Sequence, residues 1–385
     1  MRVLFSSTSG FGHVIPMFPL ANAFRAGGHE VLWATAAQSM PLVTAAGIDA
    51  VASGASGPEE AGIRRELRTL GDSVEPAARG AFVFPRMFGA ALTPPMVADL
   101  MGIARRWEPD LLVHENAELA APLVGAACGI PSVTHAFGGA VPVGPLIESG
   151  ERLAGLWQSH GLEVPPYAGC FRSGYLDICP TSVQAMSTEH IEHIQPLRPV
   201  VDTTPTSGTT GEPLVYVTMG TVQQRPELLR DVVTGVAALP VRVLVALGPQ
   251  TDAAVLGEQP GNVQVESWVD QTEVLGRCTA VVSHGGSGTF LGALARGVPQ
   301  LCLPQAADQF RNADGGGRAG VSMALAPAEV TPDAVRTAVE RLLSDPDLRL
   351  GAQRVAAEIA AMPAPEAVVP LLAAVQSRRH DDPRG

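Results

Sequence analysis

The chain has 385 residues, more than one compact hydrophobic core usually serves, so we expect two domains. Its formal net charge is −12, which argues against a nucleic-acid partner because phosphate backbones need clustered cations. The five cysteines are scattered and form no C-x-x-C pair, which argues against a disulfide framework or a structural zinc site. With no signal-peptide pattern and no apolar run long enough to span a bilayer, we expect a cytoplasmic protein without a membrane partner.

The N-terminal half alternates short apolar runs with longer amphipathic segments, which is typical of a parallel α/β sheet. The first strand is followed by a glycine-rich turn and by a helix predicted at 14–26. Residues 53–90 mix glycine, proline and charge, and we expect a loop with helical pieces there. Strands are predicted at 2–7, 30–34, 110–113 and 131–135. Residues 1–195 are therefore predicted to form one Rossmann-like domain.

A polar stretch rich in proline, threonine and glycine, residues 196–213, is typical of an interdomain linker. The alternation of strands and helices then restarts and predicts a second α/β domain over residues 214–363. Its strands are predicted at 214–218, 241–246, 263–266, 280–283 and 300–303. A last helix is expected at 364–377, followed by a frayed tail at 378–385.

The glycine-dense segment His284–Thr289 (HGGSGT) lies between a predicted strand and a helix that begins near Ser287. Glycines there let the backbone approach a ligand, and a helix N-terminus offers unpaired N–H groups and a positive dipole end. The Ser287 and Thr289 hydroxyls and the His284 imidazole add donors, so the segment predicts a diphosphate site that requires no metal. A glycine-rich turn with a serine cap and no ligand is the alternative.

From Trp268 to Asn312 the chain resembles the donor-binding signature of family 1 glycosyltransferases, which have the GT-B fold. The matching motifs occur in the family's order: Trp268-Val269-Asp270-Gln271, HGGSGT, ALARGVPQL (293–301), Pro304, Asp308-Gln309 and Asn312-Ala313. The resemblance reaches Gly12-His13-x-x-Pro16 and so covers the whole chain. It is nearest to actinomycete enzymes that decorate antibiotics and other natural products. Asp270 departs from the pattern, in which proline is usual.

The resemblance implies an enzyme of the hexosyltransferase type with two Rossmann-like domains that face each other across a cleft. The acceptor would bind to the N-terminal domain and the nucleotide sugar to the C-terminal domain, and the last helix would pack back on the N-terminal domain. Trp268 would stack on the nucleobase, the Val269 backbone would meet the base's edge, and Asp308 and Gln309 would hydrogen-bond hydroxyls of the donor sugar. The diphosphate would be held around Thr221, His284, Gly286, Ser287, Gly288 and Thr289.

His13 follows the first strand on a turn at the carboxyl edge, where α/β sheets bind ligands. A neutral imidazole is a natural general base for an acceptor hydroxyl, and the resemblance implies that it takes the acceptor's proton as the hydroxyl attacks the anomeric carbon with inversion. An orienting carboxylate is expected on the other ring nitrogen. Glu115 stands where the family usually has aspartate, and His114 is the alternative base.

The natural-product context favours a dTDP-deoxysugar as the co-substrate, with UDP-sugars as the alternative, and a hydrophobic natural product as the acceptor. No other cofactor and no metal are expected, and a homodimer is compatible with the sequence. An apolar cluster of four side chains either packs in the core or lines the acceptor site. Its members are Phe82, Phe84, Met87 and Phe88.

Two other classes of function were weighed against the transferase. Residues 10–15 look like a dinucleotide fingerprint, which would indicate an NAD-dependent oxidoreductase. However, Ile15 replaces the third glycine, and the second strand ends without an acidic residue for a ribose. A non-catalytic partner protein that binds a nucleotide sugar is the third hypothesis, against which His13 and the intact pair Asp308-Gln309 argue.

Overall fold

The computed structural model describes residues 1–55, 57–75, 78–199, 211–220, 226–248 and 252–380. Most of the predicted linker lies outside these ranges, and so does Thr221. The chain divides into two compact units. The N-terminal unit contains residues 1–178, 186–200 and 362–385, and the C-terminal unit contains residues 179–185 and 201–361. Both units are α/β, as the sequence predicts.

The N-terminal unit is built on a seven-stranded sheet with the order β3-β2-β1-β4-β5-β6-β7, in which each recorded pairing is parallel. Strand β1 is an almost uninterrupted apolar run because Val3, Leu4 and Phe5 are buried in a sheet covered on both faces. The strands are β1 (Arg2–Ser6), β2 (Glu30–Thr35), β3 (Asp49–Ala52), β4 (Leu111–Glu115), β5 (Ser132–His135), β6 (Tyr175–Asp177) and β7 (Ile194–Pro196).

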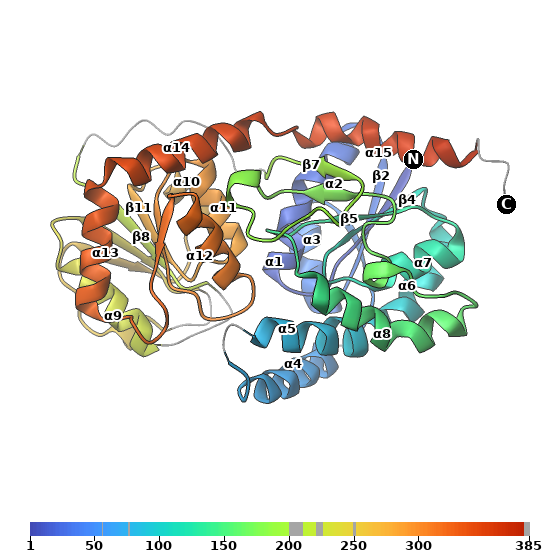
Figure 1. Ribbon diagram of the computed structural model, residues 1–385, viewed down its shortest axis with the longest axis horizontal. Coiled ribbons are helices and arrows are strands. Elements are labelled where there is room, and N and C mark those ends of the chain that lie inside the picture. Colours follow the sequence, from blue (N-terminus) through green and yellow to red (C-terminus); the bar gives the residue numbers. More distant parts are fainter. Residues whose placement is uncertain (56, 76–77, 200–210, 221–225, 249–251, 381–385) are drawn as a thin grey trace. The chain divides into compact units, whose positions relative to one another are not determined.

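Helices surround this sheet (Figure 1). The predicted helix at 14–26 is divided into short pieces because Pro16 and Pro19 each open a new helical segment. Helix α15 packs against α2 within the same unit. The helices are α1 (Phe11–Val14), α2 (Phe18–Ala26), α3 (Met40–Ala45), α4 (Gly57–Gly71), α5 (Arg79–Phe84), α6 (Thr93–Trp107), α7 (Ala120–Cys128), α8 (Val143–Ser159) and α15 (Pro365–His380).

We expected residues 53–90 to form a loop with helical pieces. This expectation is wrong, because most of the segment is helical. Helix α4 is followed by α5 and by a π-helix at Pro85–Leu92 that continues into α6. Gly57 and Pro85 stand at the starts of helical segments, where they do not break them. By length and composition the run Arg79–Trp107 could cross a membrane, but 56% of its most apolar part is buried inside the unit, as in a core helix.

The C-terminal unit contains a six-stranded sheet with the order β10-β9-β8-β11-β12-β13. Its strands are β8 (Leu214–Thr218), β9 (Arg242–Ala246), β10 (Val263–Glu266), β11 (Ala280–Ser283), β12 (Gln300–Cys302) and β13 (Ser322–Ala324). Its helices are α9 (Pro226–Ala237), α10 (Gln271–Leu275), α11 (Ser287–Ala295), α12 (Gln309–Arg318), α13 (Pro332–Ser344) and α14 (Pro346–Ala361). The predicted strands are confirmed to within a residue at each end, and α11 begins at Ser287 as expected.

In both sheets the first strand of the unit lies next to a later strand, β1 beside β4 and β8 beside β11. The chain leaves these paired strands in opposite directions across the sheet, which opens a crevice at their carboxyl ends. Helix α1, which contains His13, follows β1 after a short turn, and Glu115 ends β4. In the C-terminal unit, His284 follows β11. The topology therefore places the predicted functional residues at the edge where α/β sheets bind ligands.

Candidate active site

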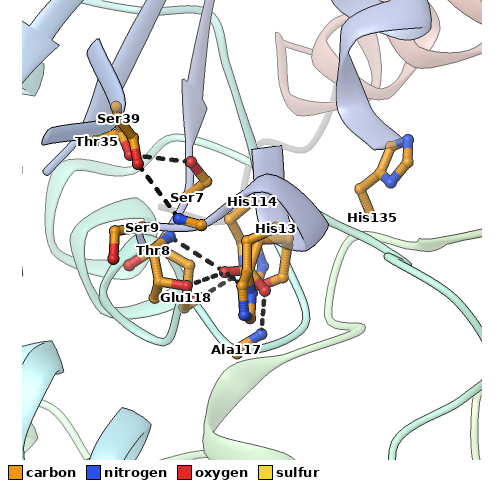
Figure 2. A network of polar contacts seen from close by, with 12 residues as sticks. Ser7, Thr8, Ser9, His13, Thr35, Ser39, His114, Ala117, Glu118 and His135 are labelled. Atoms are coloured by element: carbon orange, nitrogen blue, oxygen red, sulfur yellow. Dashed lines mark hydrogen bonds and ion pairs between the residues drawn. The ribbon is translucent and has the colours of Figure 1, made fainter. Parts of the chain in front are cut away.

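His13 and Glu115 lie in hydrogen-bond contact, as the sequence predicts. The His13 Nδ1 is 3.1 Å from the Glu115 Oε1, and the carboxylate is fully buried while the imidazole remains 21% exposed. The Thr8 backbone N–H and hydroxyl donate to the same oxygen over 3.1 and 2.8 Å, and the Ala117 N–H donates to Oε2. Figure 2 shows Thr8, His13 and Ala117, whose polar groups take part in this network.

These contacts keep Glu115 ionised. Burial by itself would raise the pKa of the Glu115 carboxyl, but the His13 charge and the hydrogen bonds from His13, Ala117 and Thr8 hold that pKa below its ordinary value. An ionised carboxylate can only accept hydrogen bonds, so the His13 Nδ1 carries the proton and donates it. When the His13 ring is neutral, its Nε2 atom then keeps its lone pair, which is the state a general base needs.

Aromatic rings flank the His13 imidazole. The Phe88 ring centroid, from the π-helix, lies 5.6 Å away, and that of Phe137, which follows β5, lies 5.1 Å away. Phe84 continues this surface, because its ring centroid is 5.1 Å from that of Phe88. The base therefore has apolar groups beside it that can contact an apolar acceptor.

The other two members of the predicted apolar cluster lie differently. Met87 is buried and packs with Ala55 and Leu92 in a small satellite core. Phe82 lies beneath the guanidinium of Arg86, which is 3.9 Å from its ring centroid. Core packing thus describes Met87, whereas Phe84 and Phe88 lie on the side of His13, where an acceptor-lining role remains a prediction.

The prediction of His114 as the alternative base is wrong. Its side chain is completely buried in β4, its Nδ1 contacts the Glu118 carbonyl at 2.7 Å, and its Nε2 contacts the Thr134 hydroxyl at 3.0 Å. Burial lowers the pKa of His114 to about 4. Alternation along the strand turns His114 into the interior, whereas Glu115 faces the His13 turn.

Two further groups beside this pair, the partly buried Thr8 and the buried Glu118, were not anticipated from the sequence. The Thr8 hydroxyl contacts Glu115, as described above. Glu118 accepts hydrogen bonds from the N–H groups of Ala120 and Ala121 at 2.7 and 3.1 Å, and so caps the start of α7. Burial raises the pKa of the Glu118 carboxyl to about 7, and the nearby Glu115 charge adds to that rise. An acidic residue just before an apolar helix is the signal that could have revealed this cap.

His284 lies against backbone that only glycine allows. A Cβ on Gly286 would be 2.4 Å from the His284 Nε2, and one on Gly220 would be 2.6 Å from its Cε1. Burial lowers the pKa of His284, so the ring is neutral, and its Nδ1 has no hydrogen-bond partner among the described residues. A buried imidazole nitrogen without a partner, close to the N-terminus of α11, is suited to an anionic ligand.

Several other predicted donor residues are brought together around the start of α11. The Ser287 hydroxyl donates to the Asp308 carboxylate at 2.5 Å. The Asn312 amide donates to the Gly285 carbonyl at 2.9 Å and to the Ser287 oxygen at 3.0 Å, a contribution that the sequence interpretation left without a role. Gln309 uses its carbonyl oxygen to accept from the N–H groups of residues 305 and 306, so its side-chain N–H₂ is the group left for a ligand. Thr289 is buried within α11, whereas Gly288 is exposed at its start.

Trp268, in the segment between β10 and α10, is 69% exposed, so an indole face is available for stacking. Val269, by contrast, is packed against a buried cluster of the unit. The Asp270 carboxylate accepts from the N–H groups of Thr272 and Glu273 at 2.9 and 3.4 Å and caps α10. Asp270 therefore starts this helix by side-chain capping.

Within the part of the chain that the structure describes, no three His, Cys, Asp or Glu side chains lie close enough together to hold a metal ion.

Known proteins are similar to this chain in sequence over nearly its whole length. Residues 22–249 match the N-terminal domain model of erythromycin biosynthesis protein CIII-like proteins, and residues 230–375 match the C-terminal domain model. The chain is 32% identical to the L-demethylnoviosyl transferase of Streptomyces niveus, with 98% of each chain covered. It is 33% identical to the elloramycin glycosyltransferase ElmGT of Streptomyces olivaceus, with 95% of each covered.

Solved structures of glycosyltransferases are similar over the whole length. The glycosyltransferase SnogD from Streptomyces nogalater is 30% identical, with a TM-score of 0.77 over 98% of this chain and 99% of that one. The glycosyltransferase VinC, solved in complex with dTDP, is 25% identical, with a TM-score of 0.77 over 98% of this chain and 100% of that one. The chain belongs to the erythromycin biosynthesis protein CIII-like family and is a GT-B glycosyltransferase of the antibiotic-biosynthesis type.

Proposed function

We propose that this glycosyltransferase moves a deoxysugar from a dTDP-sugar to a hydroxyl group of a hydrophobic natural product, with inversion at the anomeric carbon and with His13 as the general base. The observation that carries the proposal is the buried, ionised Glu115 on Nδ1 of His13. This contact leaves Nε2 as a proton acceptor at the carboxyl edge of the sheet.

In the proposed reaction, the acceptor oxygen attacks the anomeric carbon while its proton passes to the His13 Nε2. The bond between the anomeric carbon and the diphosphate oxygen breaks, and dTDP leaves with the electron pair. The N–H groups at the start of α11 and the His284 imidazole stabilise the leaving diphosphate charge. Glu115 stabilises the imidazolium that forms, since its charge is already in place before the proton moves.

Donor recognition is assigned to the C-terminal unit. Trp268 stacks on the base, and Asp308 and the Gln309 amide bind sugar hydroxyls. Support for a thymidine nucleotide comes from similar proteins, since VinC and SsfS6 were both solved with thymidine diphosphate. No metal or further cofactor takes part in this proposal. The acceptor is assigned to the apolar surface formed by Phe84, Phe88 and Phe137 beside the base.

The test is a transfer assay that follows dTDP release from a dTDP-deoxysugar, with the new glycosidic linkage assigned by the anomeric proton coupling in NMR. His13→Gln should abolish transfer while dTDP still binds, and the product of the wild type should have the opposite anomeric configuration to the donor. Full transfer by His13→Gln would reject His13 as the base, and retained configuration would reject the single displacement. Activity with UDP-sugars but not with dTDP-sugars would show that the nucleobase of the donor is uracil and not thymine.

A further inference from the structure

A second buried carboxylate, which the proposed reaction does not use, lies next to the turn that leads into α1 and His13. Glu60, in the first turn of α4, is only 3% exposed and is fully engaged. It accepts from the Arg64 Nε at 2.6 Å, from the Ser9 hydroxyl and from the Gln38 amide. A buried carboxylate with three donors from separate segments fixes those segments relative to one another.

Arg64 binds to the same turn as its partner. Its Nη2 donates to the Ser9 carbonyl at 3.3 Å and to the Ser9 hydroxyl oxygen at 3.1 Å. Both members of the Glu60–Arg64 ion pair therefore contact Ser9. The side chain of Arg64 is about one quarter exposed, so solvent screens this pair less than the pairs on the surface.

Ser9 is linked directly to the position of His13. The next residue, Gly10, accepts a backbone hydrogen bond from the His13 N–H at 3.1 Å. On the other side of Ser9, Thr8 donates to Glu115. The turn Thr8–Gly10 is thus held by two buried carboxylates, Glu115 through Thr8 and Glu60 through Ser9. Figure 2 labels Thr8, Ser9 and His13 together in this part of the unit.

A second route connects the same pair to the base through the π-helix. The Arg64 Nη1 lies 3.5 Å from the Met87 sulfur, and the next residue along the chain is Phe88, whose ring flanks His13. Interruptions of regular helix often occur at functional sites, where they direct a side chain. Here the π-helix is anchored to Arg64 one residue before the aromatic ring that meets the base.

We infer that Glu60 and Arg64 form a positioning pair for the base: they fix the Ser9–Gly10 turn and the Phe88 ring, and thereby the orientation of His13 toward the acceptor. The inference rests on the proposed role of His13. It makes α4 and the π-helix, which lie with α5 in the insertion between β3 and α6, a part of the catalytic geometry. If the pair served only to attach α4, its loss would lower the stability of the unit but would not change which ring nitrogen of His13 carries the proton.

The test compares Glu60→Gln and Ser9→Ala with the wild type. Ser9→Ala removes a single hydroxyl. It provides the test if the buried amide introduced by Glu60→Gln prevents folding. Glu340→Gln is the matched control, because Glu340 forms an i,i+4 pair with Arg336 on the surface of α13 in the other unit. Imidazole ¹⁵N spectra, recorded at alkaline pH with His13 assigned by its loss in His13→Gln, report which ring nitrogen carries the proton.

The inference predicts that the wild type and Glu340→Gln show His13 protonated on Nδ1, and that Glu60→Gln and Ser9→Ala show a mixture of both tautomers. In the transfer assay, kcat should fall by about ten- to a hundred-fold in these two variants, as expected for misplacement of a reacting group. The KM for the dTDP-sugar should stay within about two-fold, because donor residues lie in the C-terminal unit.

Folded Glu60→Gln and Ser9→Ala variants with a wild-type ¹⁵N spectrum and unchanged kcat would overturn the inference. The spectrum needs no substrate, so it separates this outcome from failure of the proposed function. If His13→Gln retained full transfer while Glu60→Gln altered the His13 spectrum, the positioning would stand and the role of His13 as base would fall.

Discussion

Glu115→Gln is the substitution to which the N-terminal site should be most sensitive, because both carboxylate oxygens accept hydrogen bonds. One oxygen accepts from His13 and from the Thr8 backbone and hydroxyl, and the other accepts from the Ala117 N–H. A glutamine supplies one oxygen and one N–H₂ group. In one orientation its N–H₂ faces the Ala117 N–H, and in the other it faces the Thr8 N–H and the His13 ring.

The magnitude follows from these contacts. A buried donor left without an acceptor costs about 1–3 kcal/mol of stability. For turnover, the orientation that directs N–H₂ at His13 favours the tautomer with the proton on Nε2, which cannot act as a base. The equivalent carboxylate-to-amide change in a serine-protease triad lowers kcat by about 10⁴, and we expect a loss of about 10³–10⁴ here.

Urea unfolding and the dTDP-release assay measure the two effects separately. Glu340→Gln, a change on the surface of α13, is the control and should alter neither by a measurable amount. Wild-type kcat in a folded Glu115→Gln variant would refute the reasoning, because it would mean that the tautomer of His13 does not matter to the reaction.

The remaining predictions concern one further acidic residue and the donor site. Burial raises the pKa of Glu118 from 4.5 to about 7, so the wild type should lose about 3 kcal/mol of stability as pH rises from about 4.5 to above 7. The Glu118→Gln variant should not show this loss, and urea unfolding at several pH values measures the difference. Gly286→Ala places a Cβ 2.4 Å from the His284 ring and should weaken dTDP binding in calorimetry by at least about ten-fold, a loss of about 1.4 kcal/mol, without unfolding the chain. Trp268→Ala removes an exposed indole, so we expect the free energy of unfolding to change by no more than about 0.5 kcal/mol. The affinity for dTDP, measured by calorimetry, should fall by about 1–3 kcal/mol.

Three results would contradict these expectations. A Glu118→Gln variant whose stability follows the wild-type pH dependence would mean that Glu118 ionises normally in the fold. Unchanged dTDP affinity in Gly286→Ala would show that the His284 ring does not contact the diphosphate. Unchanged affinity in Trp268→Ala would remove the indole from the base site.

The strands and the donor loop could be predicted because their signals are local. Buried parallel strands appear as short apolar runs, and β8, β10 and β11 lie where such runs occur. The segment from His284 to Thr289 carries its glycines at the junction of a strand and a helix, so the start of α11 at Ser287 could be derived from the sequence. The contact between His13 and Glu115 followed from the two strand ends and from the family resemblance.

The insertion between β3 and α6 could not be derived in this way. Gly57 and Pro85 stand at the starts of helical segments, and Gly62 and Gly89 lie inside them, yet in the sequence alone these residues resemble loop signals. The burial of Glu60 depends on contacts with Ser9 and Gln38, which are 51 and 22 residues away. That His114 points away from the face of Glu115 could have been derived from their positions along β4, since neighbouring residues of a strand point to opposite faces.

The most direct test of the donor assignment is the stability of the wild type in the presence of nucleotides. At about one hundred times its dissociation constant, a ligand that binds only the native state adds about 2.7 kcal/mol to the free energy of unfolding. The account predicts this gain with dTDP, its reduction in Gly286→Ala and Trp268→Ala, and no gain with NADH. Stabilisation by NADH in the absence of any effect of dTDP or UDP would contradict it.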